Sequence, residues 1–475
     1  MALFALLCFS VVFAAVISDH SHVLADPDTL WHVTLGKGVV QDGWPHGVET
    51  ASYTFQGQPF LEVEWLSDVI YYAGYAAAGW LGVITIAAAM AGFLAVILFL
   101  ALADHVKPLY AATASILLCF ATYPEFIARP HLISYVMLVF WTWRLFRRAG
   151  RDEAPEFLLL PLLSLWINLH PSYALAGVIA SFAFLDVAWR NFRTKPGLVG
   201  RWGLFLLLCP LFLLLNPYGT RPLWVTLGVA THNATMKDIE EWQPFTLGNW
   251  PFTDIYFFAV PVLLLVIRPI LPAVRAGFGL FSLYLFMKHL RFAFAYTLLA
   301  PVVLAQAIVA QVPALSAKAW RAAEPDDVER AAARGFAWFA GLLLVVPVAA
   351  IAIANARAPR PPPEFYVQDA IDFAKTHQLT GHVLNDYGFG GALIFNGVPT
   401  FVDGRSDQLF LGQFWADLKA SIRPDGKAAF DKILASQNIR WTLLKPDDLR
   451  NLFLASEGWQ KAYEDKYATI YTPPQ

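Results

Sequence analysis

Long apolar runs with almost no charge are the feature that most constrains how this chain folds. Of its 475 residues, 57% are hydrophobic and 15% are charged, whereas a soluble protein carries about 25% charged residues. A helix needs about 20 apolar residues to cross a bilayer. We therefore expect a polytopic α-helical membrane protein with about 11 transmembrane helices. The expected spans lie near 2–17, 80–103, 109–124, 131–146, 157–169, 172–189, 203–217, 253–268, 274–288, 292–311 and 336–355.

Basic residues divide unevenly between the two sets of loops that these spans create. With the first span starting inside, the inner loops and their edges hold 15 Lys and Arg residues and the outer loops hold six. Cytoplasmic loops carry the excess of Lys and Arg. We therefore expect a multi-pass protein of the cell (inner) membrane, with a large first outer loop (18–66) and a periplasmic C-terminus. The inner set is Lys107, Arg144, Arg147, Arg148, Arg151, Arg190, Arg193, Lys195, Arg201, Arg268, Arg275, Lys318, Arg321, Arg330 and Arg334, and the outer set is Lys37, Arg129, Arg221, Lys237, Lys288 and Arg291.

The first apolar run could also be a cleaved signal peptide that ends near Val23-Leu24-Ala25. It has no Lys or Arg before the apolar residues, whereas signal peptides begin with a positively charged region. This favours a retained first span.

The last hundred residues differ in composition from the transmembrane domain (1–355). A proline-rich linker, 356–363, precedes them. In 364–475 we expect strands at "HVLND", "PTFVDG", "WTLLK" and "YATIYT", with helices at Gln408–Ser421 and Lys427–Gln437. This alternation predicts a soluble α/β domain. Its segment "VDGRSD" follows an expected strand and is either a polar turn or a loop that closes over the membrane site.

Composition excludes some classes of function. The net charge of −2 gives no indication of nucleic-acid binding. The three cysteines, at positions 8, 119 and 209, lie in apolar runs, and their spacing fits no metal site.

The sequence Asp26-Pro27-Asp28 stands at the start of the first outer loop. Asp is a favoured N-cap and Pro a favoured first helical residue, so a capping role explains Asp26. Asp28 is explained less well, and the same loop contains His32 and Glu64. A carboxylate here could deprotonate an acceptor hydroxyl, and the pair could hold a divalent cation against a phosphate.

A second candidate is the basic cluster Lys288, His289 and Arg291. Long basic side chains at a membrane surface often extend to reach water. Basic residues are scarce in the outer loops, however, and Arg binds phosphate bidentately. The cluster therefore suits a phosphate at the level of the outer lipid headgroups.

Four further outer-loop residues are candidates, although each has a simpler structural role. Arg129, His131 and His170 lie near helix ends, where a single His is most often structural. Glu241 lies in a long outer loop beside a tryptophan suited to the membrane interface. A glycosylation sequon at Asn233 is interpreted as a chance match.

Together these stretches resemble the GT-C class of integral-membrane glycosyltransferases, in a bacterial branch of that class. The resemblance rests on "DPDTLWHVTLGKGVVQDGWP", "SYTFQGQPFLEVEWLSDV", "RPHLISY", "LWINLHPSY", "LNPYG", "EWQPF", "VLNDYGFGGALI" and "VDGRSD". It implies an acidic motif in the first outer loop and a polyprenyl-linked sugar as donor. It also implies Asp28 as catalytic base, Asp26 as its partner or as a metal ligand, and Lys288, His289 and Arg291 as donor-phosphate ligands. The class varies in its metal requirement, so the cofactor is left open, with a divalent cation as one option.

The sequence thus predicts an inverting glycosyltransferase that acts on a polyprenyl-linked donor among membrane lipids, with an unknown acceptor. A transporter or flippase for lipid-linked glycans is the first alternative. Transporters place charged or broken-helix features near the bilayer midplane, often in inverted repeats, and no such repeat is found here. The second alternative is a non-catalytic subunit with the same fold, which an acidic pair without access to solvent would favour.

Overall fold

The computed structural model forms two compact units. The helical unit comprises Met1–Val23, Leu81–Thr220 and Glu240–Pro359, and the mixed unit comprises Leu24–Trp80, Arg221–Ile239 and Arg360–Gln475. The chance sequon match at Asn233 and the basic residue Arg321 lie outside the described residues. The structure describes residues 1–231, 237–248, 250–318 and 327–474.

The helical unit is built from α-helices and short helical turns. Its elements are α1 (Ala2–Ser18), α2 (His20–Val23), residues 81–103 of α4 (Trp65–Ala103), α5 (Pro108–Ala121), η1 (Tyr123–Glu125), α6 (Pro130–Gly150), η2 (Phe157–Leu159), α7 (Leu160–Ile167), α8 (Tyr173–Asn191), α9 (Pro196–Phe212), η4 (Glu240–Trp242), α11 (Pro251–Ile267), α12 (Ala273–Lys288), η5 (Leu290–Phe292), η6 (Ala295–Leu299), α13 (Ala300–Val309), η7 (Pro313–Leu315) and α15 (Asp327–Ala356).

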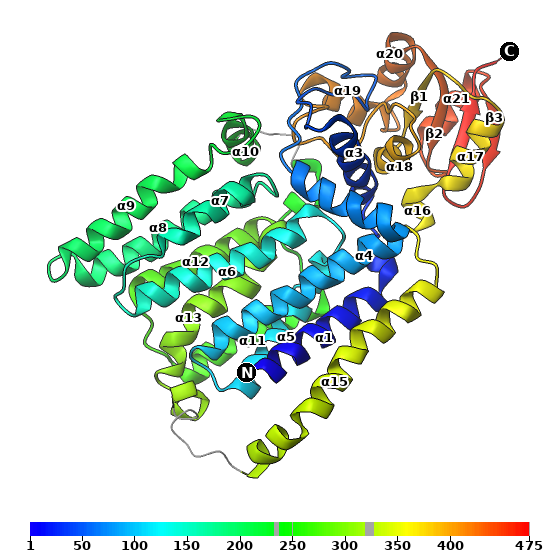
Figure 1. Cartoon of the computed structure of the whole chain (residues 1–475). Helices are drawn as coiled ribbons and strands as arrows, with labels where there is room; N and C mark the ends of the chain where they lie inside the picture. Colours follow the sequence, from blue (N-terminus) through cyan, green and yellow to red (C-terminus); the bar gives the residue numbers. More distant parts are fainter. Residues whose placement is uncertain (232–236, 249, 319–326, 475) are drawn as a thin grey trace. The chain divides into compact units, whose positions relative to one another are not determined.

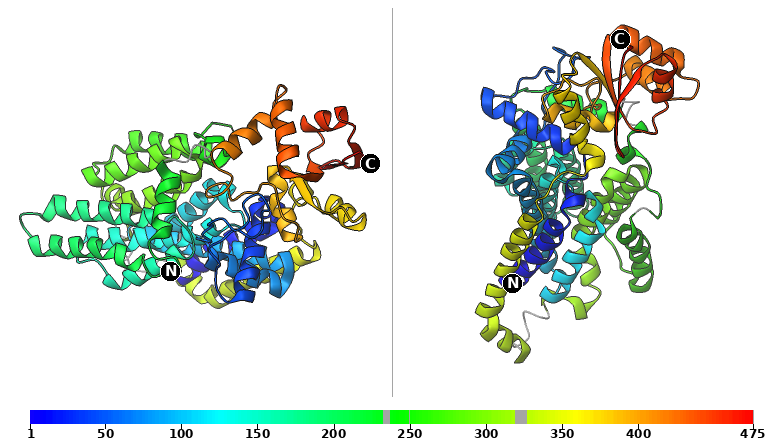
Figure 2. Two further views of the ribbon diagram at one scale, coloured as in Figure 1. Left: turned by 90° about the horizontal axis from the view of Figure 1, so that it is seen from above. Right: turned by 90° about the vertical axis from the view of Figure 1, so that its right-hand side faces the viewer.

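The long helices of this unit run side by side in a bundle (Figures 1 and 2). Helix α1 packs against α5 and against α15, which is distant in sequence. The Ser10 hydroxyl of α1 donates a hydrogen bond to the Leu343 carbonyl of α15, at 2.8 Å. Helix α8 packs between α6 and α9. The first apolar run is therefore part of the bundle core.

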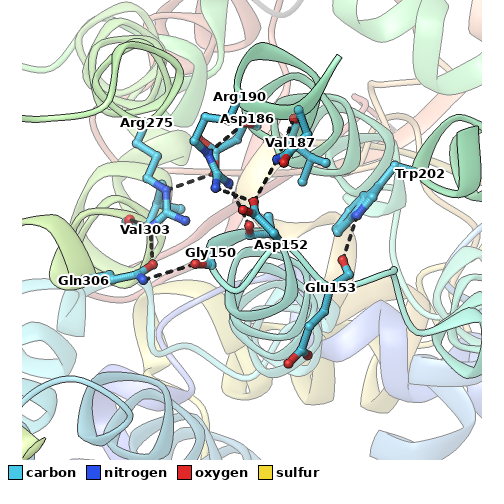
Figure 3. Close-up of polar contacts among 12 residues, drawn as sticks. Gly150, Asp152, Glu153, Asp186, Val187, Arg190, Trp202, Arg275, Val303 and Gln306 are labelled. Carbon is cyan, nitrogen blue, oxygen red and sulfur yellow. Dashed lines mark hydrogen bonds and ion pairs between the residues drawn. The ribbon is translucent and has the colours of Figure 1, made fainter. Parts of the chain in front are cut away.

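A buried polar network joins four helices at one end of the bundle (Figure 3). Asp186 of α8 pairs with Arg275 of α12 at 3.2 Å, and their side chains are 3% and 5% exposed. Arg275 also donates to Gln306 of α13, at 2.8 Å, and Arg190 donates to Asp186 at 3.1 Å. A Cβ atom on Gly150 of α6 would lie 2.2 Å from Gln306 Oε1, so a larger residue there would displace the Gln306 side chain. Each buried charge has a partner, as burial of charge requires.

Nine apolar helices in the described ranges match expected spans. Three are long and apolar enough to cross a membrane, namely Trp65–Ala103, Tyr173–Asn191 and Leu290–Val309. Six shorter apolar helices have 10–17 residues: Ala2–Ser18, Pro108–Ala121, Phe157–Ile167, Pro196–Phe212, Pro251–Ile267 and Leu343–Ala356. The remaining two expected spans fall on α6 and α12. These helices indicate a membrane protein, while the number of crossings and the compartment at each end stay predictions.

Helix α4 breaks directly before its membrane-length apolar part. Ala78 and Gly79 have non-helical backbone angles, and φ of Gly79 is +57°. That region strongly favours glycine. The break separates residues 65–77 from the apolar part of α4.

The mixed unit contains a small sheet and short helices. Its elements are α3 (Asp28–Asp42), residues 65–80 of α4, α10 (Arg221–Thr231), α16 (Pro363–Tyr366), α17 (Gln368–Thr376), β1 (His382–Asn385), η8 (Tyr387–Phe389), α18 (Gly390–Phe395), α19 (Gln413–Ser421), α20 (Lys427–Gln437), β2 (Ile439–Leu444), α21 (Arg450–Ser456), β3 (Gln460–Glu464) and β4 (Thr469–Thr472).

The four strands form one mixed sheet in the order β1-β2-β4-β3. Strands β1 and β2 are parallel and are joined by a crossover that contains helices α18 to α20, while β4 runs antiparallel to both β2 and β3. Figure 1 shows these strands in yellow to red. This topology confirms that the tail contains a small sheet with α/β character.

Most expected elements of the tail are present, and two expectations are wrong. "HVLND", "WTLLK" and "YATIYT" coincide with β1, β2 and β4, and the helix predicted at Lys427–Gln437 is α20. "PTFVDG" is not a strand of the sheet, because Thr400 forms only an isolated bridge, with Ser52 of the first loop. "VDGRSD" therefore follows no sheet strand. Helix α19 begins at Gln413 rather than at Gln408.

The first loop and the tail share one hydrophobic core within the mixed unit. Phe60 is buried together with tail residues such as Phe401 and Phe410, and Tyr53 and Phe55 pack against the same cluster. Backbone hydrogen bonds also join the first loop to the tail. The Tyr53 N–H donates to the Thr400 carbonyl, at 3.1 Å. The first loop is therefore folded onto the tail over much of its length. The domain limits near 355 and 364 stay predictions.

Candidate active site

Asp26 makes the contact that a helix cap requires. Its Oδ1 atom accepts a hydrogen bond from the Asp28 backbone N–H, at 2.7 Å, at the start of α3. Pro27, directly before α3, already has helical backbone angles, with φ −62° and ψ −24°, so Asp26 stands in the position of a cap. The capping interpretation of Asp26 therefore agrees with the geometry.

Asp28 is the first residue of α3, and its carboxylate has a different set of contacts. The indole Nε1–H of Trp31, one turn later, donates to Asp28 Oδ1 at 2.9 Å. Both Asp26 and Asp28 are half-buried. A carboxylate at a helix N-terminus is stabilised by the helix dipole. Partial access to solvent is the condition that a general base needs in order to meet a substrate hydroxyl.

His32 is a packed residue next to this pair. Its side chain is 1% exposed, and its Nδ1 atom lies 2.6 Å from Asp68 Oδ1. Nε2 lies 3.8 Å from Glu64 Oε2, and the Glu64 side chain is 20% exposed. The His32 ring also lies against Trp31, with centroids 3.6 Å apart. These contacts fit a structural role for His32 and leave Glu64 as the more accessible carboxylate.

Two arginines of the helical unit share one carboxylate. Arg129 Nη1 forms an ion pair with Glu241 Oε1, and Arg291 Nη1 lies 4.0 Å from Glu241 Oε2. The guanidinium carbon of Arg291 lies 4.5 Å from the centroid of the Trp242 ring. The structure thus brings together Arg129, Glu241 and Arg291, which were separate candidates in the sequence. We name these three residues the arginine cluster.

Local sequence explains how these side chains reach each other. Arg129 precedes Pro130 and has an extended backbone, with φ −128° and ψ 159°, as a residue before proline prefers. His289 ends α12 in an extended conformation. Its Nδ1 atom lies 2.7 Å from the Trp242 carbonyl oxygen, and so holds the 240–242 turn beside η5.

The electrostatics of the arginine cluster favour an ionised Glu241. Burial raises the pKa of this carboxyl, but the charges of Arg129 and Arg291 outweigh burial and lower the pKa to about 2. The side chain is still 38% exposed. Two guanidinium groups that hold a partly exposed anion could also bind a phosphate.

Lys288 does not join this cluster. It is exposed, and its Nζ atom lies 5.8 Å from the centroid of Tyr284, one turn earlier in α12. This is the arrangement that the alternative interpretation of the basic residues predicted, in which the side chain extends to reach water.

The two remaining histidines have structural contacts. His131 Nε2 lies 2.7 Å from the Glu125 carbonyl oxygen. His170 Nδ1 accepts from the Ser172 backbone N–H, at 3.1 Å. Burial, and then the nearby His131 and the two cluster arginines, lower the pKa of His170, so its ring is neutral at pH 7.

Sequence reasoning missed a half-buried acid, Glu125, beside these groups. The Tyr135 hydroxyl donates to Glu125 Oε2 at 3.0 Å. Burial, and then the charge of Glu241, raise the pKa of Glu125 to about 8. The signal was its place in the polar motif "YPEFIARPHLISY".

No cluster of three or more His, Cys, Asp or Glu side chains that could hold a metal ion occurs in the ranges that the structure describes. A divalent cation at Asp26 and Asp28 therefore stays a prediction. The three cysteines are buried and free.

The chain is similar to several solved structures, of which two are described here. One is the crystal structure of the Archaeoglobus fulgidus oligosaccharyltransferase in the apo form, with a TM-score of 0.53, 11% identity, and coverage of 93% of this chain and 69% of that chain. The other is ArnT from Cupriavidus metallidurans bound to undecaprenyl phosphate, with a TM-score of 0.30, 14% identity, and coverage of 99% and 98%. The second TM-score is too low to argue from. No protein-family model and no curated protein matches the chain.

The likeness to the oligosaccharyltransferase concerns the fold alone, because the two sequences share 11% identity. The oligosaccharyltransferase is a GT-C glycosyltransferase, and the chain has a GT-C-like fold. This confirms the architecture that the sequence resemblance implied. The roles of individual residues are not tested by it.

Proposed function

We propose that this chain is a membrane glycosyltransferase that transfers a sugar from a polyprenyl-linked donor to an acceptor. The GT-C-like fold supports the reaction class. The observation that carries the proposal is that Asp26 and Asp28 make different contacts at the start of α3. Asp26 makes the bond to the first turn of α3, whereas the half-buried carboxylate of Asp28 accepts from the Trp31 indole and is the one that we assign to chemistry.

In this proposal Asp28 acts as general base. The acceptor hydroxyl loses its proton to the Asp28 carboxylate while its oxygen attacks the anomeric carbon of the donor sugar. The bond between that carbon and the phosphate oxygen breaks, and the lipid phosphate leaves with the bonding electrons. Attack opposite to the leaving group inverts the anomeric configuration.

Arg291 is the principal donor-phosphate ligand in the proposal, and Arg129 assists it. Both already bind one carboxylate, Glu241, and guanidinium groups bind phosphate in the same way. Lys288 and His289 are assigned secondary roles, because Lys288 lies over Tyr284 and His289 lies against the Trp242 carbonyl oxygen.

The two alternatives receive less support. An acidic pair without access to solvent would favour a non-catalytic subunit. Asp26 and Asp28 are only half-buried, so they do not meet this condition. A lipid-linked glycan transporter keeps charged groups at the bilayer midplane. The buried pair Asp186–Arg275 lies instead near the end of α8 and the start of α12, where it fits a structural link between helices.

The proposal also assigns a side of the membrane. The uneven distribution of basic residues supports an orientation with the first loop and the tail outside the cytoplasm. An alkaline phosphatase fused after Gln475 should be active. An inactive fusion, together with an active cytoplasmic reporter at the same site, would contradict this orientation.

The reaction itself is tested with purified full-length protein and a panel of polyprenyl-phosphate and polyprenyl-pyrophosphate sugars. Release of the lipid phosphate in the presence of a membrane extract as acceptor source is the expected result. An Asp28→Asn variant tested in parallel identifies release that is due to this chain. No release from any donor, with folded protein, would exclude the proposal for those donors and favour the subunit alternative.

A further inference from the structure

The backbone of the "VDGRSD" segment lies directly against the proposed catalytic base. A Cβ atom built on Gly404 would lie 1.8 Å from Asp28 Oδ1 and 2.7 Å from its Cγ. Real Cβ contacts essentially never fall below 3.0 Å. The φ angle of Gly404 is not positive, so the position does not need glycine for its backbone conformation. A methyl group here would instead collide with the Asp28 carboxylate, so that this side chain or the segment would have to shift.

A second close approach lies at the same helix end. A Cβ atom on Gly391 of α18 would lie 2.1 Å from the Pro27 carbonyl oxygen, and one on Gly390 would lie 2.4 Å from Asp403 Cβ. The segment "NDYGFGG" and the "VDGRSD" segment thus pack against each other and against the start of α3. Two tail segments therefore contact this helix end, one at the Pro27 carbonyl and one at the Asp28 carboxylate.

The "VDGRSD" segment is in turn held by an ion-pair clamp, which we define as Arg405, Asp403 and Glu49. Arg405 donates to both oxygens of Asp403, with Nε at 2.8 Å from Oδ1 and Nη2 at 2.7 Å from Oδ2. It also binds both oxygens of Glu49, with Nη2 at 3.0 Å from Oε1. All three side chains are at most 1% exposed. Such a forked arrangement fixes position more strongly than a single contact does.

Glu49 connects the clamp to the backbone of the first loop. Its Oε1 atom accepts from the Ala51 and Ser52 backbone N–H groups, at 2.6 and 2.5 Å. The guanidinium carbon of Arg405 also lies 5.1 Å from the centroid of Phe60. The clamp therefore ties the tail segment around Gly404 to two points of the first loop, one at Ala51 and Ser52 and one at Phe60.

We propose that Gly404, held in place by the ion-pair clamp, sets the position of the Asp28 carboxylate for transfer. This inference rests on the proposed function, and it makes Gly404 and Arg405 positioning residues, since neither is assigned contact with substrate. The tail domain is then a part of the catalytic apparatus. A methyl group at position 404 should displace the Asp28 carboxylate without altering donor binding.

The contact itself is tested without substrate by a double-mutant cycle on the melting temperature. Gly404→Ala should lower Tm by several degrees when Asp28 is present. The same change should have little effect in the Asp28→Ala background, because the side chain that collides with the new methyl group is shorter. Gly38→Ala is the matched control, since a Cβ at that position of α3 meets nothing within 4 Å. An equal loss of Tm in both backgrounds would overturn the proposal.

The positioning role is tested by turnover with a polyprenyl-linked sugar that the wild type transfers. The carboxylate or the segment must move by about 1 Å to accept the methyl group, and a shift of that size can cost about 100-fold in rate. Gly404→Ala should therefore lower kcat by about that factor with the donor KM unchanged. Wild-type kcat in Gly404→Ala overturns the inference and leaves the proposed function standing. No transfer by the wild type itself overturns the proposed function and the positioning role with it, whereas the Tm cycle still reports the contact.

A second variant keeps the test decisive if Gly404→Ala is unstable. Glu49→Asp retains the charge and shortens the clamp by one methylene. The Gly404 segment should therefore shift less than it does in Gly404→Ala. We expect kcat to fall by about tenfold with the donor KM unchanged. A folded Glu49→Asp protein with wild-type kcat would contradict the role of the clamp.

Discussion

Arg405 and Glu49 lie 356 positions apart in the chain and form an ion pair whose side chains are 1% and 0% exposed. Removing one partner leaves a buried charge without its full compensation, which typically costs about 3–5 kcal/mol. Glu49→Gln should therefore lower Tm of the full-length protein by several degrees, as measured by thermal unfolding in detergent. Lys461→Gln is the control, because the Lys461–Glu464 pair is about half exposed and such pairs contribute about 0–1 kcal/mol. Equal Tm values for the two variants would contradict a stabilising clamp.

A second buried acid of the mixed unit should make stability depend on pH. Glu62 is 7% exposed, and its Oε2 atom is among those that have no hydrogen-bond partner within the described residues. Burial raises its pKa from 4.5 to about 7. His46 and Arg405 favour the charged form, while Glu49 and Asp42 oppose it.

Because the folded protein keeps a proton that the unfolded chain releases, Glu62 costs stability increasingly as pH rises from about 4.5 to about 7. The loss between pH 5 and pH 8 is on the order of 2–3 kcal/mol. Glu62→Gln mimics the neutral acid, so its Tm should fall less than the wild-type Tm between these pH values. Parallel Tm curves for the two proteins would contradict a raised pKa.

The helices and the tail sheet could be predicted from the sequence because their signals are local. Apolar runs gave the spans, and β-branched runs gave β1, β2 and β4. Strand β3 was missed because its residues, Gln460–Glu464, are mostly exposed at the sheet edge and show no apolar alternation. "PTFVDG" was misassigned because Thr400 forms its backbone bonds with the first loop instead of with the sheet.

The arrangement of the site could be predicted less well, because it depends on pairs that are distant in sequence. The sequence identified Arg129, Glu241 and Arg291 individually. It contained no signal that one carboxylate would join the two arginines. The approach of Gly404 to Asp28 could not be predicted either, since a glycine in a polar segment is usually a turn residue.

Donor binding should depend more on Arg291 than on Lys288. Arg291 lies beside Glu241 and Trp242, whereas Lys288 is exposed over Tyr284. A charge-assisted hydrogen bond is worth about 1.5–3 kcal/mol, so Arg291→Gln should weaken binding of a polyprenyl phosphate more than tenfold. Lys288→Gln should change the measured Kd by less than about threefold, and the double variant should resemble Arg291→Gln. Unchanged affinity in the double variant would leave both residues as interfacial anchors.

Glu241 should compete with the donor phosphate for the two arginines. Its pKa of about 2 keeps it ionised from pH 5 to pH 8, so the competition is constant over that range. Glu241→Gln removes the competing charge and should tighten polyprenyl phosphate binding by several-fold at pH 7. Weaker binding in this variant would mean that Glu241 orients the arginines rather than competing with the ligand.

Asp28→Asn tests the assignment of the base, and Asp26→Asn is its matched control. Asn caps a helix about as well as Asp, so Asp26→Asn should retain the bond to the Asp28 N–H and most of the activity. Asn at position 28 keeps the shape and the oxygen that Trp31 requires, and losing a charge near the helix dipole costs only about 0.3–1 kcal/mol. General-base catalysis contributes about 10²–10⁴-fold, so turnover should fall by that factor while Tm and donor affinity barely change. If Asp28→Asn transfers sugar at the wild-type rate, Asp28 is a helix-end residue. The base must then be sought first at Glu64, whose side chain is 20% exposed, and next at Glu241.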